Sequence, residues 1–217
     1  MVVRFSSKLA LLFKADLESV TDVAPADGYE WHFKIQCNSC HEIDPSWITM
    51  NREDTYDLAN SRGSANLVMK CKFCKRESSA QFEPTPPIKP YTADDSGRFT
   101  KMVVIDCRGL EPVEFEPRVS EGWRGDCSPY CADRIGVSYV KKRMKLVRFF
   151  TFWDDTFAIR YVAYPTSPPQ SGWMAKGAES GTRFDDIDLS EGEWVEYDEK
   201  SAVPVSISNI EAKFQKA

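Results

Sequence analysis

Cys37-Asn-Ser-Cys40 and Cys71-Lys-Phe-Cys74 are two Cys-x-x-Cys motifs separated by thirty residues, and the interpretation of the whole chain depends on them. We call each motif a knuckle. The two-residue gap lets both sulfur atoms of a knuckle face one ion, and four thiolates suit tetrahedral Zn²⁺ with Zn–S distances near ~2.3 Å. The motifs therefore predict one closed, structural zinc site. Because the usual spacing is roughly 15–20 residues, the longer segment between the knuckles is expected to fold as an ordered excursion.

Strand patterns lead into both knuckles. Residues 29–37 alternate apolar or aromatic with polar side chains, and residues 67–70, apolar except for Lys70, predict a second strand before Cys71. The alternation predicts that His32 faces solvent, opposite Trp31 and Phe33. Helical periodicity is weak nearly everywhere, so the predicted fold class is mainly β. Further strands are expected at 11–17, 99–107, 113–116 and 203–214.

A proline cluster at residues 84–90 indicates a boundary between two small β-sheet parts. The first part, residues 1–83, is predicted to hold the zinc site. The second, residues 84–217, is predicted to be metal-free.

The composition is that of an ordinary soluble globular protein, with 217 residues, 42% hydrophobic and 28% charged. The sequence shows neither a convincing signal peptide nor a run of ~18 apolar residues. We therefore expect a cytoplasmic monomer with nuclear access and no membrane association. In such a chain, paired knuckles favour metal binding over disulfides, although three of the seven cysteines, Cys107, Cys127 and Cys131, remain outside the knuckles.

The net charge of −5 is unevenly distributed. Residues 124–170 carry eight basic and four acidic side chains, so the rest of the chain holds a net charge of −9. A body this acidic repels phosphate backbones, and we expect no binding to nucleic acid.

Several motifs, in order, resemble the eukaryotic CXXC-motif-containing zinc-binding proteins, a family of unknown function. The resemblance implies a compact β-rich protein with two similar halves, a structural zinc on the four knuckle cysteines and no established enzymatic activity. The matching stretches are 31–40, 62–65 leading into 71–74, 88–91, 107–115, 179–184, 186–187, Trp194 and 197–200.

The block at about 124–173 departs from this resemblance. It is basic and rich in aromatic residues, and Gly122-Trp123 recurs as Gly172-Trp173 at its end. We interpret it as an insert in the second half. A retained intron or a gene-model error is the favoured origin, and a true lineage-specific insertion is the alternative.

The other candidate side chains carry weaker signals. His41 follows Cys40 and is interpreted as a solvated loop residue, with an alternate metal ligand as the other option. Cys107 ends a predicted strand, so it is either the counterpart of a knuckle in a metal-free half or a buried small hydrophobe. Cys127 and Cys131 lie in the atypical block and are given little weight as a metal pair.

The predicted function is that of a non-enzymatic, zinc-stabilised protein that acts through unknown protein partners. Trp47 and Trp194 are the candidate exposed aromatic residues for such contacts. One alternative is a metal-handling protein, because paired thiolates also accept Cu(I). Another is a thiol oxidoreductase that uses the Cys-x-x-Cys pairs, although the sequence shows no βαβ context for a reactive thiolate.

Overall fold

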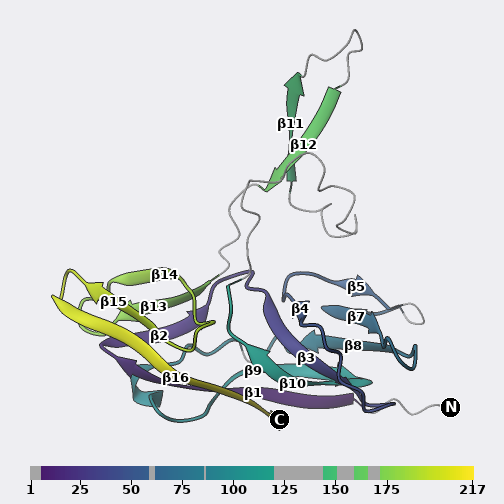
Figure 1. Cartoon of the computed structure of the whole chain (residues 1–217), viewed down its shortest axis with the longest axis horizontal. Helices are drawn as coiled ribbons and strands as arrows, with labels where there is room; N and C mark the ends of the chain where they lie inside the picture. The colour runs from purple at the N-terminus through teal and green to yellow at the C-terminus, as the bar shows by residue number, and fades with distance from the viewer. Residues whose placement is uncertain (1–5, 59–61, 86, 120–143, 151–158, 166–171) are drawn as a thin grey trace. The chain divides into compact units, whose positions relative to one another are not determined.

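The computed structural model describes residues 6–58, 62–85, 87–119, 144–150, 159–165 and 172–217 (Figure 1). Within them the protein is built from strands and one short 3₁₀ helix, which confirms the mainly β prediction. No helix in these ranges is long and apolar enough to cross a membrane. The elements are β1 (Ser6–Glu18), β2 (Val20–Pro25), β3 (Trp31–Cys37), β4 (Ile48–Met50), β5 (Tyr56–Asp57), β6 (Ser64–Ala65), β7 (Leu67–Lys70), β8 (Glu77–Phe82), η1 (Ala93–Asp95), β9 (Thr100–Arg108), β10 (Leu110–Glu116), β11 (Met144–Phe150), β12 (Ile159–Pro165), β13 (Trp173–Gly177), β14 (Arg183–Ile187), β15 (Trp194–Asp198) and β16 (Val203–Lys216).

The chain divides into two compact units. The larger one comprises Met1–Ser120 and Gln170–Ala217, and the smaller one is Glu121–Pro169. The smaller unit contains the antiparallel pair β11–β12 and lies within the predicted insert, except for its first three residues. Trp173, which was predicted to close the insert, belongs instead to β13 of the larger unit.

The larger unit is organised around a six-stranded antiparallel sheet with the order β15-β16-β1-β9-β8-β7. β9 continues into β10 through Gly109, and β1 continues into β2 through Ser19; both linking residues have positive φ, 80° and 56° respectively. β10 pairs with β3, and β2 pairs with β13, in two separate three-stranded sheets. The larger unit therefore contains two similar sets of strands. The first set is β3, β7, β8, β9 and β10, and its strands correspond in this order to β13, β15, β16, β1 and β2 of the second set.

The predicted boundary at residues 84–90 does not separate these two similar sets of strands. β1 and β2 precede the boundary but pair with the C-terminal strands β16 and β13. β9 and β10 follow it but pair with β8 and β3 of the zinc-bearing set. A proline cluster affects only the local backbone conformation, whereas contacts between residues far apart in sequence determine which strands pair.

Aromatic side chains fill the interior of the larger unit. The Trp173 ring stacks on Phe13 at a centroid distance of 5.3 Å and meets the edge of Tyr29 at 5.6 Å. Trp31 of β3 lies 6.3 Å from Phe33 and is 1% exposed. Large rings in offset and edge-on contacts dominate the energetics of such a core. The predicted inward face of β3 is therefore confirmed.

The prediction that His32 faces solvent is wrong, since this side chain is only 7% exposed. β3 is the central strand between β10 and β4, and the face that carries His32 is buried at His32 and partly buried at Lys34 and Gln36. Burial, together with the nearby positive charge of Arg118, lowers the pKa of His32 from 6.5 to about 4. Period-two alternation predicts a solvent face only where no other segment covers it.

Candidate metal centre

Each knuckle is a turn that follows a strand. Cys37 is the last residue of β3, and Cys71 comes directly after β7, as the sequence predicted. The two strands belong to different sheets, so the knuckles approach each other from separate parts of the fold. Each turn is closed by backbone hydrogen bonds, in which the Cys37 N–H donates to the Glu42 carbonyl at 3.0 Å and the Cys71 N–H donates to Arg76 at 2.9 Å.

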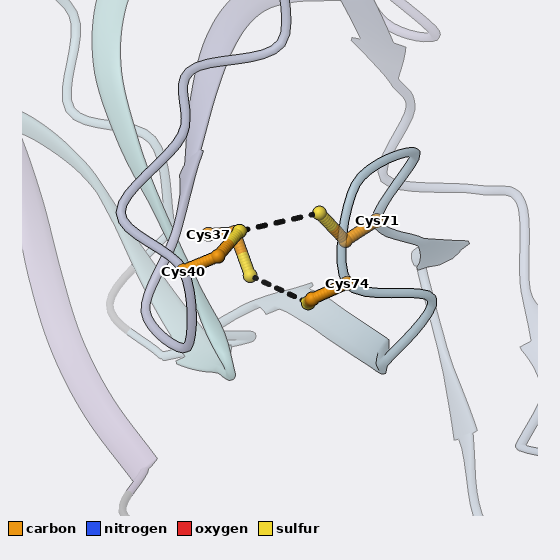
Figure 2. Close-up of side chains that lie close together, drawn as sticks. All are labelled: Cys37, Cys40, Cys71 and Cys74. Atoms are coloured by element: carbon orange, nitrogen blue, oxygen red, sulfur yellow. Dashed lines mark hydrogen bonds between the residues drawn. The ribbon is translucent and has the colours of Figure 1, made fainter.

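The four predicted side chains converge on one point (Figure 2). The Sγ atoms of Cys37 and Cys74 lie 3.7 Å apart, those of Cys40 and Cys71 also 3.7 Å apart, and all four lie within 4.8 Å of one another. A tetrahedron with Zn–S bonds of ~2.3 Å has sulfur–sulfur edges of about 3.8 Å. The sulfur positions therefore fit one tetrahedral zinc ion, and the prediction of a zinc cofactor is confirmed.

The turns direct backbone N–H groups at the sulfur atoms. Burial raises the pKa of Cys37, but hydrogen bonds from the N–H groups of Ser39 and Cys40 and from the Cys74 thiol outweigh it and lower the pKa to about 7. The N–H groups of Cys74 and Phe73 lower the pKa of Cys71 in the same way. Hydrogen bonding to the charged form favours it. The turn backbone thus favours the thiolates that zinc binds.

Polar contacts also join the two knuckles, and the sequence motifs did not reveal them. Lys72 in the second knuckle makes an ion pair of 2.8 Å with the buried carboxylate of Asp44, which follows the first knuckle. Arg76 donates a hydrogen bond of 3.0 Å to the Ser39 hydroxyl of the first knuckle. These two contacts join residues of one knuckle to residues in or next to the other, so each belongs to both turns of the site.

The remaining sequence candidates among the described residues are not part of the thiol cluster. His41 is exposed, as the loop interpretation predicted, and is not among the four clustered ligands. Cys107 lies within β9, paired with Ser7 on one side and Ala80 on the other, and is 0% exposed. Burial raises the pKa of its thiol to about 12.

The interpretation of Cys107 as the counterpart of a knuckle is therefore wrong, and the buried-hydrophobe alternative is correct. A strand-end pattern cannot distinguish the two because it does not reveal that Cys107 has strand partners on both sides and is fully buried. Cys127 and Cys131 lie outside the described residues.

The exposed apolar side chains differ from those expected. Trp47 is half-buried between the cations of Lys34 and Arg118, and Trp194 is half-buried against Phe184. The exposed ones include Phe73 at 55% and Ile43 at 46%, which lie in and just after the knuckles. Aromatic type alone does not predict exposure, because Trp47 and Trp194 find packing partners that are distant in sequence.

Known proteins share the sequence pattern. A family model described as "CXXC motif containing zinc binding protein, eukaryotic" matches residues 10–128 and 157–215. Proteins of that name from Homo sapiens and Mus musculus are each 33% identical over 210 residues, covering 96% of this chain and 98% of the relative. A UPF0587 protein of Schizosaccharomyces pombe is 32% identical over 212 residues, covering 97% and 99%. Residues 129–156, between the two matched segments, fall inside the predicted insert.

Solved structures share the fold. The crystal structure of C1orf123 superposes with a TM-score of 0.69 at 32% sequence identity, covering 97% of this chain and 99% of that one. A hypothetical protein from Plasmodium falciparum superposes with a TM-score of 0.66 at 19% identity, covering 96% and 99%, and this likeness concerns the fold alone. The family resemblance and the β fold that it implied are therefore confirmed.

Proposed function

Because the chain belongs to the family of eukaryotic CXXC motif containing zinc binding proteins, we propose that it is a non-enzymatic protein whose single zinc ion is structural. The observation that carries the proposal is the closed set of four thiols around one point. Structural zinc sites have four protein ligands, whereas catalytic sites keep a position for water or substrate. A zinc ion whose four coordination positions are occupied by thiolates has no such open position, so its role is to hold the knuckles together.

The zinc ion would connect the two knuckles, which are not connected by pairing between their strands. β3 and β7 belong to different sheets, and the described contacts between the knuckles are polar pairs that include an exposed lysine and an exposed arginine. The ammonium of Lys72 is exposed, so water screens its ion pair with the buried Asp44, and the Arg76–Ser39 hydrogen bond adds only about 1 kcal/mol. The zinc ion is then the main link between these two turns.

Metal removal from the purified protein tests the structural role. We expect the zinc to resist a mild chelator at neutral pH and to leave only as the fold opens, with zinc release and the circular-dichroism change following one time course. Complete release from a protein whose circular dichroism and proteolysis pattern stay unchanged would contradict a structural site.

We further propose that the protein acts by binding another protein through the knuckle face. Ile43 and Phe73 are supported as contact residues because they are large, apolar and exposed, and each lies in or beside one knuckle. A shallow hollow, lined by Cys37, Met69 and Leu110 among others, reaches Phe73. Apolar side chains held by a rigid support are typical contact residues of protein interfaces. A zinc-held pair of turns provides that support.

The interaction is tested with Phe73→Asp, compared with Val195→Asp as a matched control. Val195 is 62% exposed and lies on β15, at the opposite edge of the six-stranded sheet from β7. Cross-linking in cytoplasmic extract, read by mass spectrometry, should show partners that Phe73→Asp loses and that Val195→Asp retains. Equal partner sets for both variants and the parent would overturn the proposed face.

Metal handling is a second candidate, favoured by the partial exposure of Cys40 and Cys74. A carrier would exchange its zinc for labelled zinc, or for Cu(I), while remaining folded, and a structural site would not. The thiol oxidoreductase alternative receives no comparable support, since both described sulfur–sulfur contacts of 3.7 Å join different knuckles instead of the two cysteines of one Cys-x-x-Cys pair.

A further inference from the structure

The knuckles share a backbone signature that can be recognised without cysteine. In each knuckle, the N–H of the first cysteine donates a hydrogen bond to the carbonyl of the residue five positions later. The carbonyl of the same cysteine accepts a hydrogen bond from the N–H of the residue four positions later. The residue at that fourth position has positive φ, which is uncommon for residues other than glycine. In the first knuckle, the Cys37 N–H donates to Glu42 at 3.0 Å and the His41 N–H donates to Cys37 at 2.8 Å. In the second, the Cys71 N–H donates to Arg76 at 2.9 Å and the Lys75 N–H donates to Cys71 at 3.0 Å. The φ angle is 61° at both His41 and Lys75.

The same signature occurs at the end of β13. Gly177 donates its N–H to the Thr182 carbonyl at 2.8 Å and accepts the N–H of Gly181 at 3.0 Å, and Gly181 has a φ of 65°. A related turn follows β15, where Asp198 pairs with Val203 five positions later and Ala202, at the fourth position, has a φ of 55°.

These two turns occupy matching places in the sheet order. The first knuckle follows β3 and the second follows β7; the two further turns follow β13 and β15, the matching strands of the other set. One hydrogen bond repeats as well. Asn38, after Cys37, donates its N–H to the Gly109 carbonyl at 3.1 Å, and Ala178, after Gly177, donates its N–H to the Ser19 carbonyl at 2.9 Å. Gly109 and Ser19 are the residues through which β9 and β1 continue into the next strand.

The side chains at the matching positions also converge. Ser180 donates a hydrogen bond to the Asp198 carboxylate, and Thr182 donates one of 2.9 Å to the same group. A Cβ atom added to Gly177 would lie 2.5 Å from the Ser180 hydroxyl and 2.6 Å from an Asp198 oxygen, so position 177 also faces this point. Asp198 is 1% exposed, and its remaining partners are the Ser201 hydroxyl and the Lys200 N–H.

We propose that Gly177, Ser180, Asp198 and Ser201 stand at the four ligand positions of a second knuckle pair, in which the Asp198 carboxylate takes over the linking role of a metal ion. A buried carboxylate is stable when several donors satisfy it, and here the donors come from both turns. Ser180 and Thr182 belong to the first turn, and Lys200 and Ser201 belong to the second. The two matching ends of the fold are therefore held by different chemistry, zinc at one and a hydrogen-bonded carboxylate at the other.

The inference concerns residues outside the zinc site and does not depend on the proposed function. It is tested by restoring the missing ligands with the combined variant Gly177→Cys, Ser180→Cys, Asp198→Cys and Ser201→Cys. Bound zinc should rise from about one to about two per chain, and the thiolate-to-metal charge-transfer absorption of the Co²⁺-loaded protein should double.

A matched control variant carries Glu179→Cys in place of Ser180→Cys, which keeps four new cysteines but breaks the Cys-x-x-Cys spacing of the first turn. It should bind a single tightly held ion. A folded restored variant that binds only one ion, or a control that binds two equally well, would overturn the proposal.

A second variant keeps the proposal testable even where the restored variant fails to fold. Asp198→Asn should speed hydrogen exchange of the Gly177 and Gly181 amides by about tenfold or more, because a charged acceptor of several bonds is replaced by a neutral one. The amides of Cys37 and Lys75 should keep their rates. Asp188→Asn, which alters an exposed carboxylate bonded only to the Ser190 N–H among its described partners, is the control. Unchanged exchange at Gly177 and Gly181 in Asp198→Asn would overturn the linking role.

Discussion

The Sγ atom of Cys37 lies 3.7 Å from that of Cys74, although the two residues are 37 positions apart and belong to different knuckles. This distance fits an edge of a zinc–thiolate tetrahedron. The contact links the end of β3 to the turn after β7, and these strands share no sheet.

Replacing one of these thiols should remove the metal. In Cys74→Ser we expect bound zinc to fall from about one ion per chain toward zero, because a neutral hydroxyl is a poor substitute for a thiolate. Zinc binding contributes roughly 10–16 kcal/mol in small zinc-finger peptides, so the melting temperature should fall as well. Elemental analysis and circular dichroism measure both effects. Cys107→Ala, which alters a buried thiol outside the cluster, should keep the zinc. Full zinc content in Cys74→Ser would contradict the four-thiolate site.

Burial of His32 should make stability depend on pH. Its pKa is about 4 in the folded protein, against 6.5 for an ordinary histidine. Between pH 6.5 and 4 the unfolded chain takes up a proton that the folded protein does not, so stability is full above pH 6.5 and declines as the pH falls. Allowing for solvent screening, the decline from pH 7 to pH 5 should be about 1–2 kcal/mol.

Urea unfolding at pH 7 and pH 5 measures this decline. His32→Gln should show a smaller loss than the parent, whereas protonation of the knuckle thiolates affects both alike. His41→Asn removes the other histidine, which is exposed, and should lose as much as the parent. Identical pH dependence of His32→Gln and the parent would refute the assignment.

Trp173 should be one of the costliest side chains to truncate. It is 0% exposed and contacts Phe13, Tyr29 and Phe115 at centroid distances of 5.3, 5.6 and 6.5 Å. Removal of so large a ring leaves a cavity, and Trp173→Ala should lower the free energy of unfolding by about 3–5 kcal/mol. Denaturant titration measures the change. The half-buried Trp194 is the control, and a loss in Trp173→Ala no larger than in Trp194→Ala would show that Trp173 is not central to the core.

The Tyr91 hydroxyl compensates for a bulge in β1. The pairing of β1 with β16 shifts between Lys14 and Asp16, and the N–H of Ala15 donates instead to the Tyr91 oxygen at 3.3 Å. The Tyr91 hydroxyl also lies 2.6 Å from the Asp95 carbonyl, to which it can donate. Tyr91→Phe leaves the buried Ala15 N–H and the partly buried Asp95 carbonyl without that partner and should cost about 1–3 kcal/mol. Tyr197→Phe, at an exposed site, should change the free energy of unfolding by less than about 0.5 kcal/mol. Equal values for the two variants would contradict the role of Tyr91.

The local patterns of the sequence were sufficient for part of the strands, such as β3 and β9, and for the convergence of the four thiols, whereas β2, β8 and β13–β15 were not predicted. Alternating residues before Cys37 predicted β3, and the fixed gap within each Cys-x-x-Cys motif predicted four thiols facing one ion. Both features depend on neighbours in the chain. Period-two side-chain direction and the reach of a two-residue turn are properties of the local backbone.

Contacts between residues far apart in sequence decided what the patterns could not. The tertiary structure placed β1 and β2 with the C-terminal strands, buried His32, and left Cys107 buried and paired on both sides near the end of β9. It also brought Ser180 to Asp198. The sequence by itself determined that the protein is β-rich and that Cys37, Cys40, Cys71 and Cys74 have the spacing of a four-thiolate zinc site. Only the tertiary structure showed a second pair of matching turns, because these turns lack cysteine and resemble the knuckles in backbone geometry and in the convergence of their side chains.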